Sequence, residues 1–277
     1  LLAERGRSVA IVRHPMPYGD LVAQAVQRFA TLDDLTRHAC TIEEMEEYEP
    51  HIRAGHVVFA GVDYEKILRA AEGEADIVLW DGGNNDLPFY ASDLEIVLVD
   101  PHRAGHETRY YPGESNLRRA DVVVVSKVAT AAPARVAELE ASVREICPTA
   151  RLIEGDLAIE VDHPELLRGA RALIVEDGPT TTHGGMSTGA GWVAVRDHGG
   201  TPVDPRPVAV GSIADTFARH PHLDAVLPAM GYGDAQIRDL ERTIAAADAD
   251  VVVIATPVDL RRLLTIRQPT VRVGYAY

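Results

Sequence analysis

The sequence is poor in the features that mark several protein classes. It holds only two cysteines, Cys40 and Cys147, which lie far apart. This excludes a disulfide framework and a cysteine-based metal cluster, and it fits a reducing compartment. No apolar run approaches the ~18 residues of a membrane-spanning helix, and no secretory signal is visible. We therefore expect a cytoplasmic protein with no membrane partner.

Positive charge is also scarce. The 277 residues carry 27 Lys and Arg against 42 Asp and Glu, and the formal net charge of −15 argues against non-specific binding to nucleic acid. Only Lys66 and Lys127 are lysines, so a lysine at the end of a predicted strand is unusual for this chain. The remaining composition is that of a globular protein with one large domain or two smaller ones.

Short apolar runs alternate with amphipathic segments along the whole chain. The runs are continuously apolar, as in strands that are covered on both faces of a parallel sheet. We expect strands at 8–12, 76–80, 94–100, 121–125, 150–154, 171–176, 250–255 and 270–275, and helices at 63–71, 133–146 and 234–246. This alternation predicts an α/β fold with a doubly wound, mostly parallel sheet.

The domain organisation follows from the same pattern. We expect either a first part at 1–155 and a second at 156–277, or one domain over 1–277. The acidic stretch "TIEEMEEYEP" (41–50) is interpreted as a solvated helix without chemistry. In a sheet of this type, ligands bind beyond the carboxyl ends of the strands. Polar, Gly or Pro residues follow most of the predicted strands, so we expect one site at that edge.

The stretch "DIVLWDGGNNDLPFY" (76–90) carries the densest polarity at any strand end. An acid that closes a buried strand, here Asp81, holds Mg²⁺ or its water shell in nucleotide hydrolases. The glycines that follow let backbone N–H groups approach an anion. Asn84, Asn85 and Asp86 offer further polar ligands. The structural alternative for Asp81 is a turn or helix-capping acid.

Two further strand ends suggest nucleotide binding. Lys127 follows "VVVVS", where the lysine stem can lie along a nucleotide base. In guanine-nucleotide proteins an Asp two residues later reads the base, but Ala129 stands here, which favours adenine or another base. The alternative is a surface lysine whose stem covers apolar area. His14 and Thr256 follow two other predicted strands.

Two polar segments are candidates for anion binding. "EDGPTTTHGGMSTGAG" (176–191) combines Thr180, Thr181, Thr182 and His183 with glycines before a predicted helix, which favours phosphate or carboxylate. A flexible connector is the alternative. "DPHRAGHETRYYPGESNLRRAD" (100–121) concentrates basic residues, and arginine forks suit phosphate or carboxylate. The alternative for these arginines is ion pairing with surface acids.

Together, "AGVDYEKIL", "WDGGNNDLPFY", "DPHRAGHETRYYPGESNLRRAD", "EDGPTTTHGGM" and "ATPVDL" resemble the cyclic 2,3-diphosphoglycerate synthetase family along essentially the whole chain. The resemblance implies the fold of P-loop NTPases of the metallochaperone GTPase type. It also implies a homodimeric ligase that uses ATP and Mg²⁺ to close a phosphoanhydride in 2,3-diphosphoglycerate or a similar polyanionic metabolite.

The chain departs from this family in one respect, because it contains no Gly-Lys dipeptide and hence no P-loop. "LLAERGRSVAIV" predicts the end of a helix capped by Gly6, followed by a strand. The resemblance therefore leads us to expect the P-loop upstream of residue 1, and an inactive isolated fragment.

The resemblance implies a role for each candidate residue. Asp81 would hold the metal and, with Asn84, Asn85, Asp86 and Arg103, form the catalytic set. His106, Arg109, Arg118, Thr180, Thr181, Thr182 and His183 would bind the substrate, and His14, Lys127 and Thr256 the nucleotide. Two other functions stay open at this point. One is a GTPase-like metallochaperone or regulatory protein, and the other is a non-catalytic ligand-binding module.

Overall fold

Two compact units make up the structure, which is a computed structural model that describes residues 2–14, 20–82, 86–231 and 233–276. Unit 1 runs up to Val26 and resumes over Phe59–Ala158, together with the last residues of the chain. Unit 2 consists of Gln27–Val58 and Ile159–Tyr275. Within the described part of the chain, no helix is long and apolar enough to cross a membrane.

The first sheet of unit 1 has β1 at its centre. β1 (Val9–Arg13) runs parallel to β4 (Ile77–Trp80) on one side, and β3 (Val57–Ala60) lies on its other side. α3 (Tyr64–Glu72) buries Ile67 and Ala71, and its N-cap, Asp63, accepts a hydrogen bond from the Lys66 N–H. Before β1, the short 3₁₀ helix η1 (Ala3–Arg5) ends at Gly6 with a φ of 74°, which confirms the predicted glycine cap.

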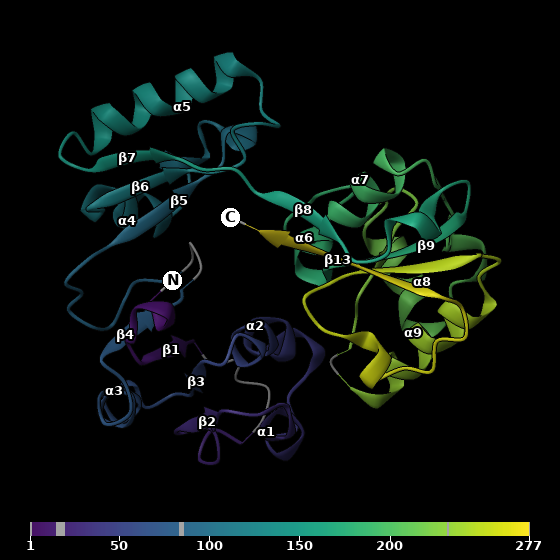
Figure 1. Cartoon of the computed structure of the whole chain (residues 1–277), viewed down its shortest axis with the longest axis horizontal. Coiled ribbons are helices and arrows are strands. Elements are labelled where there is room, and N and C mark those ends of the chain that lie inside the picture. The colour runs from purple at the N-terminus through teal and green to yellow at the C-terminus, as the bar shows by residue number, and fades with distance from the viewer. Residues whose placement is uncertain (1, 15–19, 83–85, 232, 277) are drawn as a thin grey trace. The chain divides into compact units, whose positions relative to one another are not determined.

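The second sheet of unit 1 is built from three parallel strands. β5 (Ile96–Val99), β6 (Val122–Val125) and β7 (Arg151–Glu154) lie in that order. α4 (Gly113–Arg119) and α5 (Pro133–Ile146) pack on it through a core of Val99, Leu117, Val123, Val125, Leu139 and Val143. Figure 1 shows α5 running along this sheet, and its first residue is the proline that the sequence placed there. η2 (Pro101–Arg103) and η3 (His106–Thr108) connect β5 to α4.

The sheet of unit 2 has buried strands at its centre, because β9 and β12 are covered almost throughout. β9 (Arg171–Glu176), β12 (Val251–Ala255) and β13 (Thr270–Ala276) lie side by side and parallel. β8 (Ala158–Val161) follows β13, while β10 (Thr201–Pro202) and β11 (Leu227–Pro228) pair with the first and second halves of β9. The helices of this unit are α6 (Gly178–Thr182), α7 (Ala190–Asp197), α8 (Gly211–Arg219) and α9 (Asp234–Ala246). The 3₁₀ helices η4 (Pro164–Leu167), η5 (Arg206–Val208) and η6 (Leu260–Arg262) complete the unit.

An early segment of the chain also belongs to unit 2. It contains β2 (Gln27–Phe29), α1 (Leu32–Arg37) and α2 (Ile42–Arg53). α2 begins with a capping box in which Thr41 and Glu44 bond to each other's backbone N–H groups. The interpretation of this acidic stretch as a solvated helix is wrong, because α2 buries Glu44, Glu46 and Glu49 together with its apolar side chains. The count of acids hid a buried face, on which Glu46 and Glu49 find partners on distant segments, while Glu44 bonds locally to Thr41.

The predicted strands and helices are confirmed, each within two residues of its expected ends. The α/β class with parallel strands is confirmed as well. The sequence predicted one doubly wound sheet, whereas the described strands form separate sheets. The P-loop NTPase type of fold and the division into 1–155 and 156–277 stay predictions.

Candidate functional site

In unit 1, the carboxyl ends of β1 and β4 bring an acid and a base together. The Asp81 N–H donates to the Val12 carbonyl at 2.9 Å, which continues the parallel ladder. Nη1 of Arg13 lies 2.8 Å from Oδ1 of Asp81, and Arg13 is only 8% exposed. The predicted site residues did not include Arg13, although it directly precedes His14 at a strand end. Asp81 is thus held and neutralised by a buried guanidinium.

His14 and Asp86 meet at the same edge. Nδ1 of His14 lies 3.0 Å from Oδ2 of Asp86. The Asp86 carbonyl accepts a hydrogen bond of 2.8 Å from Nδ2 of Asn116, which anchors the segment to α4. His14 thus contacts Asp86, while Asp81 contacts Arg13, the residue before His14. The roles predicted for His14, Asp81 and Asp86 stay predictions. Asn84 and Asn85 lie outside the described residues.

These side chains do not by themselves make a magnesium site. Among the residues that the structure describes, no three acid, histidine or cysteine side chains are grouped so that they could hold a metal ion. Asp81 faces the guanidinium of Arg13, and Asp86 faces the imidazole of His14. A cation that bound Asp81 directly would have to displace or sit beside the positive charge of Arg13. The proposed Mg²⁺ role of Asp81 stays a prediction.

The basic segment at 100–121 lies on the surface of unit 1. Arg103, His106 and Arg109 are exposed, and the ring of His106 stacks edge-on against Tyr110 at 5.2 Å. Nη2 of Arg118 forms an ion pair of 2.6 Å with Glu114, one helical turn earlier. The structure thus favours the ion-pair alternative for Arg118. Exposed pairs of this kind add little stability.

Lys127 joins the ends of β5 and β6. Its Nζ lies 2.8 Å from Oδ2 of Asp100, the residue that follows β5. Lys127 also has a positive φ of 57°, which is uncommon for a residue other than glycine. The side chain is therefore held at the strand edge, where the sequence analysis expected it, and its charge is engaged by an acid.

In unit 2, the buried carboxyl of Glu46 and the half-buried carboxyl of Asp177 meet at the ends of β9 and β12. Oγ1 of Thr256 donates a hydrogen bond of 2.6 Å to Oε1 of Glu46, which reaches the edge from α2. The carboxyl groups of Glu46 and Asp177 also share a hydrogen bond. Burial raises the pKa of Glu46 well above its ordinary value, and the negative charge of Asp177 adds to this. Burial raises the pKa of Asp177 too. The pair therefore retains a proton where ordinary carboxyls have lost theirs.

Glu176, the last residue of β9, is a third buried acid. Its carboxylate accepts the N–H groups of Gly189 at 3.1 Å and Trp192 at 2.9 Å, at the start of α7. Burial nonetheless raises its pKa to about 7, because the loss of water outweighs these hydrogen bonds. A Cβ on Gly189 would lie 2.4 Å from Oε2 of Glu176, so only glycine permits this close approach.

The threonines after β9 use their hydroxyl groups within their own segment. Oγ1 of Thr180 donates to Oδ2 of Asp177 at 2.6 Å, and Oγ1 of Thr181 donates to the Asp177 carbonyl at 2.8 Å. Oγ1 of Thr182 donates to the Gly178 carbonyl at 2.8 Å and lies 3.2 Å from Nδ1 of His183. Their role in substrate binding stays a prediction, and Thr180 and His183 are the exposed members.

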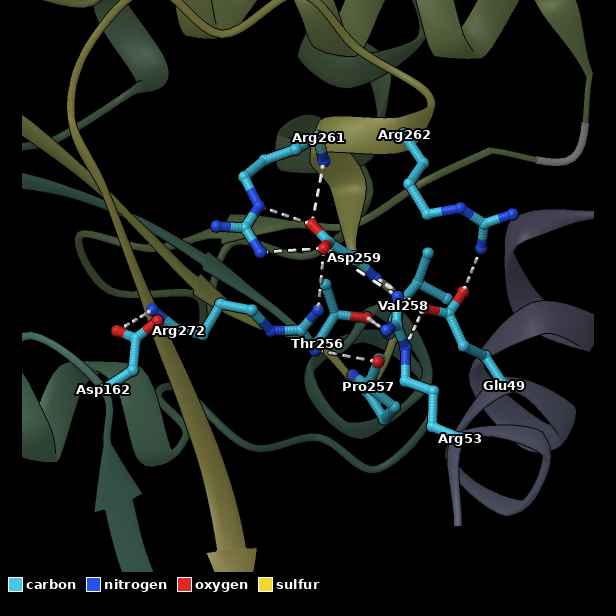
Figure 2. A network of polar contacts seen from close by, with 10 residues as sticks. All are labelled: Glu49, Arg53, Asp162, Thr256, Pro257, Val258, Asp259, Arg261, Arg262 and Arg272. Carbon is cyan, nitrogen blue, oxygen red and sulfur yellow. Dashed lines mark hydrogen bonds and ion pairs between the residues drawn. The ribbon is translucent and has the colours of Figure 1, made fainter. Parts of the chain in front are cut away.

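A second network fixes α2 to the end of β12, as Figure 2 shows. The fully buried carboxylate of Glu49 forms ion pairs with Nη2 of Arg53 at 2.7 Å and with Nη1 of Arg262 at 2.9 Å. Asp259 forms an ion pair with Nε of Arg261 at 2.8 Å. The hydrogen bond from Arg261, with the charges of Arg261 and Arg272, lowers the pKa of Asp259. Asp259 is therefore ionised at neutral pH, in contrast to the proton-sharing pair beside Thr256.

The predicted site residues did not include Glu46, Glu49, Glu176 and Asp177. A signal was present for Glu49, because it falls at helical spacing on the same face as Ile42, Met45 and Ile52. A charged residue on an apolar helix face indicates a buried partner. No local signal marked Glu46, whose partners follow two distant strands.

The chain is similar to a curated protein over nearly its whole length. No family model matches the chain. Over 276 residues the chain is 59% identical to a protein named arginine synthetase ArcE, from Thermococcus kodakarensis. The match covers 99% of this chain and 62% of the relative, so the chain spans less than two thirds of the relative's length. The relative carries the name of a synthetase, and the resemblance to the cyclic 2,3-diphosphoglycerate synthetase family stays a prediction.

Proposed function

We propose that the chain is part of an ATP-dependent synthetase, which forms a covalent bond at the expense of ATP. The observation that carries the proposal is the 59% identity with ArcE over 99% of the chain, which takes in both units. The strand-end groups of each unit are consistent with a ligand site in a parallel α/β protein. Guanine readout would need an acid two residues after Lys127, and Ala129 stands there, which agrees with ATP rather than GTP.

We propose arginine as the product of this synthetase. In chemical terms, a guanidinium group forms when ammonia replaces the oxygen of a ureido group. The γ-phosphoryl group of ATP would be transferred to that oxygen, which would then leave as inorganic phosphate when ammonia replaces it. ADP would be the other product. The protonated pair of Glu46 and Asp177, with Glu176 beside it, offers carboxyl oxygens at the ends of β9 and β12. Carboxyl oxygens accept hydrogen bonds from the N–H groups of a guanidinium group and of its neutral ureido precursor. This chemistry suits an amino acid with such a side chain better than a triply charged anion.

The second candidate is a synthetase that closes a phosphoanhydride in 2,3-diphosphoglycerate or a similar polyanion. The segment at 100–121 supports it, because Arg103 and Arg109 are exposed on the surface of unit 1. The pairing of Arg118 with Glu114 weakens it. In both candidates we expect a small-molecule substrate, Mg²⁺ and a homodimer.

One experiment separates these functions. The complete polypeptide is incubated with ATP and Mg²⁺, and with either citrulline plus nitrogen-15 ammonium or 2,3-diphosphoglycerate. We expect labelled arginine by mass spectrometry in the first mixture and no cyclic product by phosphorus NMR in the second. A cyclic product alone would support the second candidate. Nucleotide hydrolysis without either product would favour a GTPase-like metallochaperone, and no turnover at all would favour a ligand-binding module.

A variant tests the role of Asp81 in the same assay. Asp81→Asn keeps an oxygen that can accept the hydrogen bond from Arg13 but removes the negative charge. We expect turnover to fall by on the order of 100-fold, as for the loss of one group that stabilises the transition state electrostatically. Asp93→Asn, at an exposed acid of the same unit, is the matched control and should leave turnover unchanged. Full turnover of Asp81→Asn would remove Asp81 from the mechanism.

A further inference from the structure

Two strands of unit 1 lie at the edges of their sheets, although their apolar sequences are typical of strands in the middle of a sheet. Among the described strands, β4 is bonded to a neighbour on one side only, β1, and β5 likewise to β6 alone. β4 reads Ile-Val-Leu-Trp and β5 reads Ile-Val-Leu-Val, and both run parallel to their neighbours. Continuously apolar parallel strands normally lie inside a sheet, with both edges paired. An apolar edge is a template for pairing with another strand.

The backbone of both strands presents hydrogen-bonding groups at these edges. In a parallel ladder, alternate residues bond to the same neighbour. The N–H groups of Ile77 and Asp81 donate to β1, so those of Val78 and Trp80 point to the open side of β4. The carbonyls of Glu95 and Val99 accept from β6, so the backbone groups of Ile96 and Leu98 point away from it.

The side chains near these edges are exposed as well. Leu79 of β4 is 40% exposed, and Ile96 and Leu98 of β5 are 54% and 56% exposed. By contrast Val99, on the other face of β5, is buried under the helices of this sheet. An edge strand that bordered solvent would be expected to carry charged or proline residues, and neither strand has one.

We propose that one further apolar β-strand pairs in parallel with both β4 and β5 and joins the two sheets of unit 1 into one. The occupant is a strand of the same, longer polypeptide. The match with ArcE takes only 62% of that relative's length, which leaves more than a third of it outside the aligned region. A strand of roughly 5 residues is enough to pair with β4 and β5. Its carboxyl end would lie between Asp81 and Asp100, the residues that follow these two strands.

Hydrogen exchange tests this proposal without reference to catalysis. Amide exchange is measured by mass spectrometry in the isolated chain of residues 1–277 and in the complete polypeptide of the same gene. We expect the peptides over β4 and β5 to exchange at least about 100-fold more slowly in the complete polypeptide, because their edge N–H groups become bonded. β7, which is the opposite edge of its sheet, is the matched control and should exchange equally in both.

Equal exchange at β4 and β5 in the two polypeptides would overturn the proposal, as would a gene that encodes nothing beyond these residues. Protection that rises with the concentration of the isolated chain would also overturn it, since the occupant would then be a second copy. A variant gives an independent readout. Leu98→Lys should lower Tm by at least about 5 °C in the complete polypeptide and leave the isolated chain nearly unchanged. Leu166→Lys, at an exposed leucine of η4, should behave alike in both.

Discussion

Three carboxyl groups of unit 2 are held away from water at the ends of two strands, and this burial controls their protonation. Glu46, Glu176 and Asp177 all have raised pKa values, with burial as the main cause. Asp259, also at the end of β12, is surrounded by arginines and has a lowered pKa. Acids at one sheet edge thus have pKa values shifted in opposite directions, because each side chain meets different partners.

The raised pKa of Glu176 makes stability depend on pH. The folded chain keeps this proton up to about pH 7, whereas the unfolded chain loses it near the ordinary pKa of 4.5. Between these values the folded state binds more protons, so the free energy of unfolding falls as pH rises. The stabilisation is complete below the unfolded pKa and is lost as pH passes the folded one. The full effect is on the order of 3 kcal/mol.

Denaturant titrations between about pH 5 and pH 8 measure this dependence. Glu176→Gln cannot titrate, so its free energy of unfolding should fall less steeply with pH than that of the wild type. Glu145→Gln, at an exposed acid, is the control and should keep the wild-type slope. A wild-type slope in Glu176→Gln would show that this group is not the source.

Thr256 supports Glu46 through one short hydrogen bond in a buried site. Thr256→Val keeps the shape of the side chain but removes the donor, so the carboxyl of Glu46 loses one partner. We expect the free energy of unfolding to fall by about 1–3 kcal/mol. Thr265→Val, on the surface of the same unit, should change it by less than about 0.5 kcal/mol. If Thr256 instead contacted only nucleotide, the stability of the ligand-free protein would not change.

At the scale of elements, α2 depends on polar contacts for its place in unit 2. Glu49 is fully buried and ion-pairs with Arg53 and Arg262, which are partly exposed. Glu49→Gln removes the charge that neutralises them. Because water screens both arginines, we expect a loss of about 1–3 kcal/mol rather than the larger cost of a fully buried pair.

Hydrogen exchange over residues 42–53 provides the local measurement for this prediction. In Glu49→Gln, the amides of α2 should exchange faster, while those of α9 keep their rates. Glu65→Gln on α3, where the side chain is exposed, is the matched control. Unchanged exchange in α2 would mean that its apolar side chains alone hold the helix in place.

The elements were predictable where one local property decided the outcome. Continuous apolar runs located β9 and β12, and a proline followed by helical spacing located α5. α2 was misjudged because its acids lie on a face that is buried by segments far away in sequence. The same reason explains the site. Strand ends predicted that His14 and Asp86 would meet, but the partner of Thr256 comes from a helix 210 residues earlier.

At the scale of the whole molecule, unit 2 is discontinuous in sequence. Its sheet lies in Ile159–Tyr275, but α2 lies in Gln27–Val58. We expect residues 159–277 alone to be much less stable than the full chain, because Asp177, Thr256 and Asp259 would lose the partners that α2 supplies. A fusion of residues 27–58 to this fragment through a flexible linker should restore a cooperative unfolding transition. An equally stable fragment without residues 27–58 would contradict this.

The 210 residues between Glu46 and Thr256 also set a delay during synthesis. At ribosomal rates of about 5–20 residues per second, the Thr256 hydroxyl that donates to the Glu46 carboxyl emerges roughly 10–40 s after Glu46. Throughout that interval the nascent chain carries a helix whose inward face cannot yet dock. The early segment therefore completes its burial only after nearly the whole of unit 2 has been synthesised.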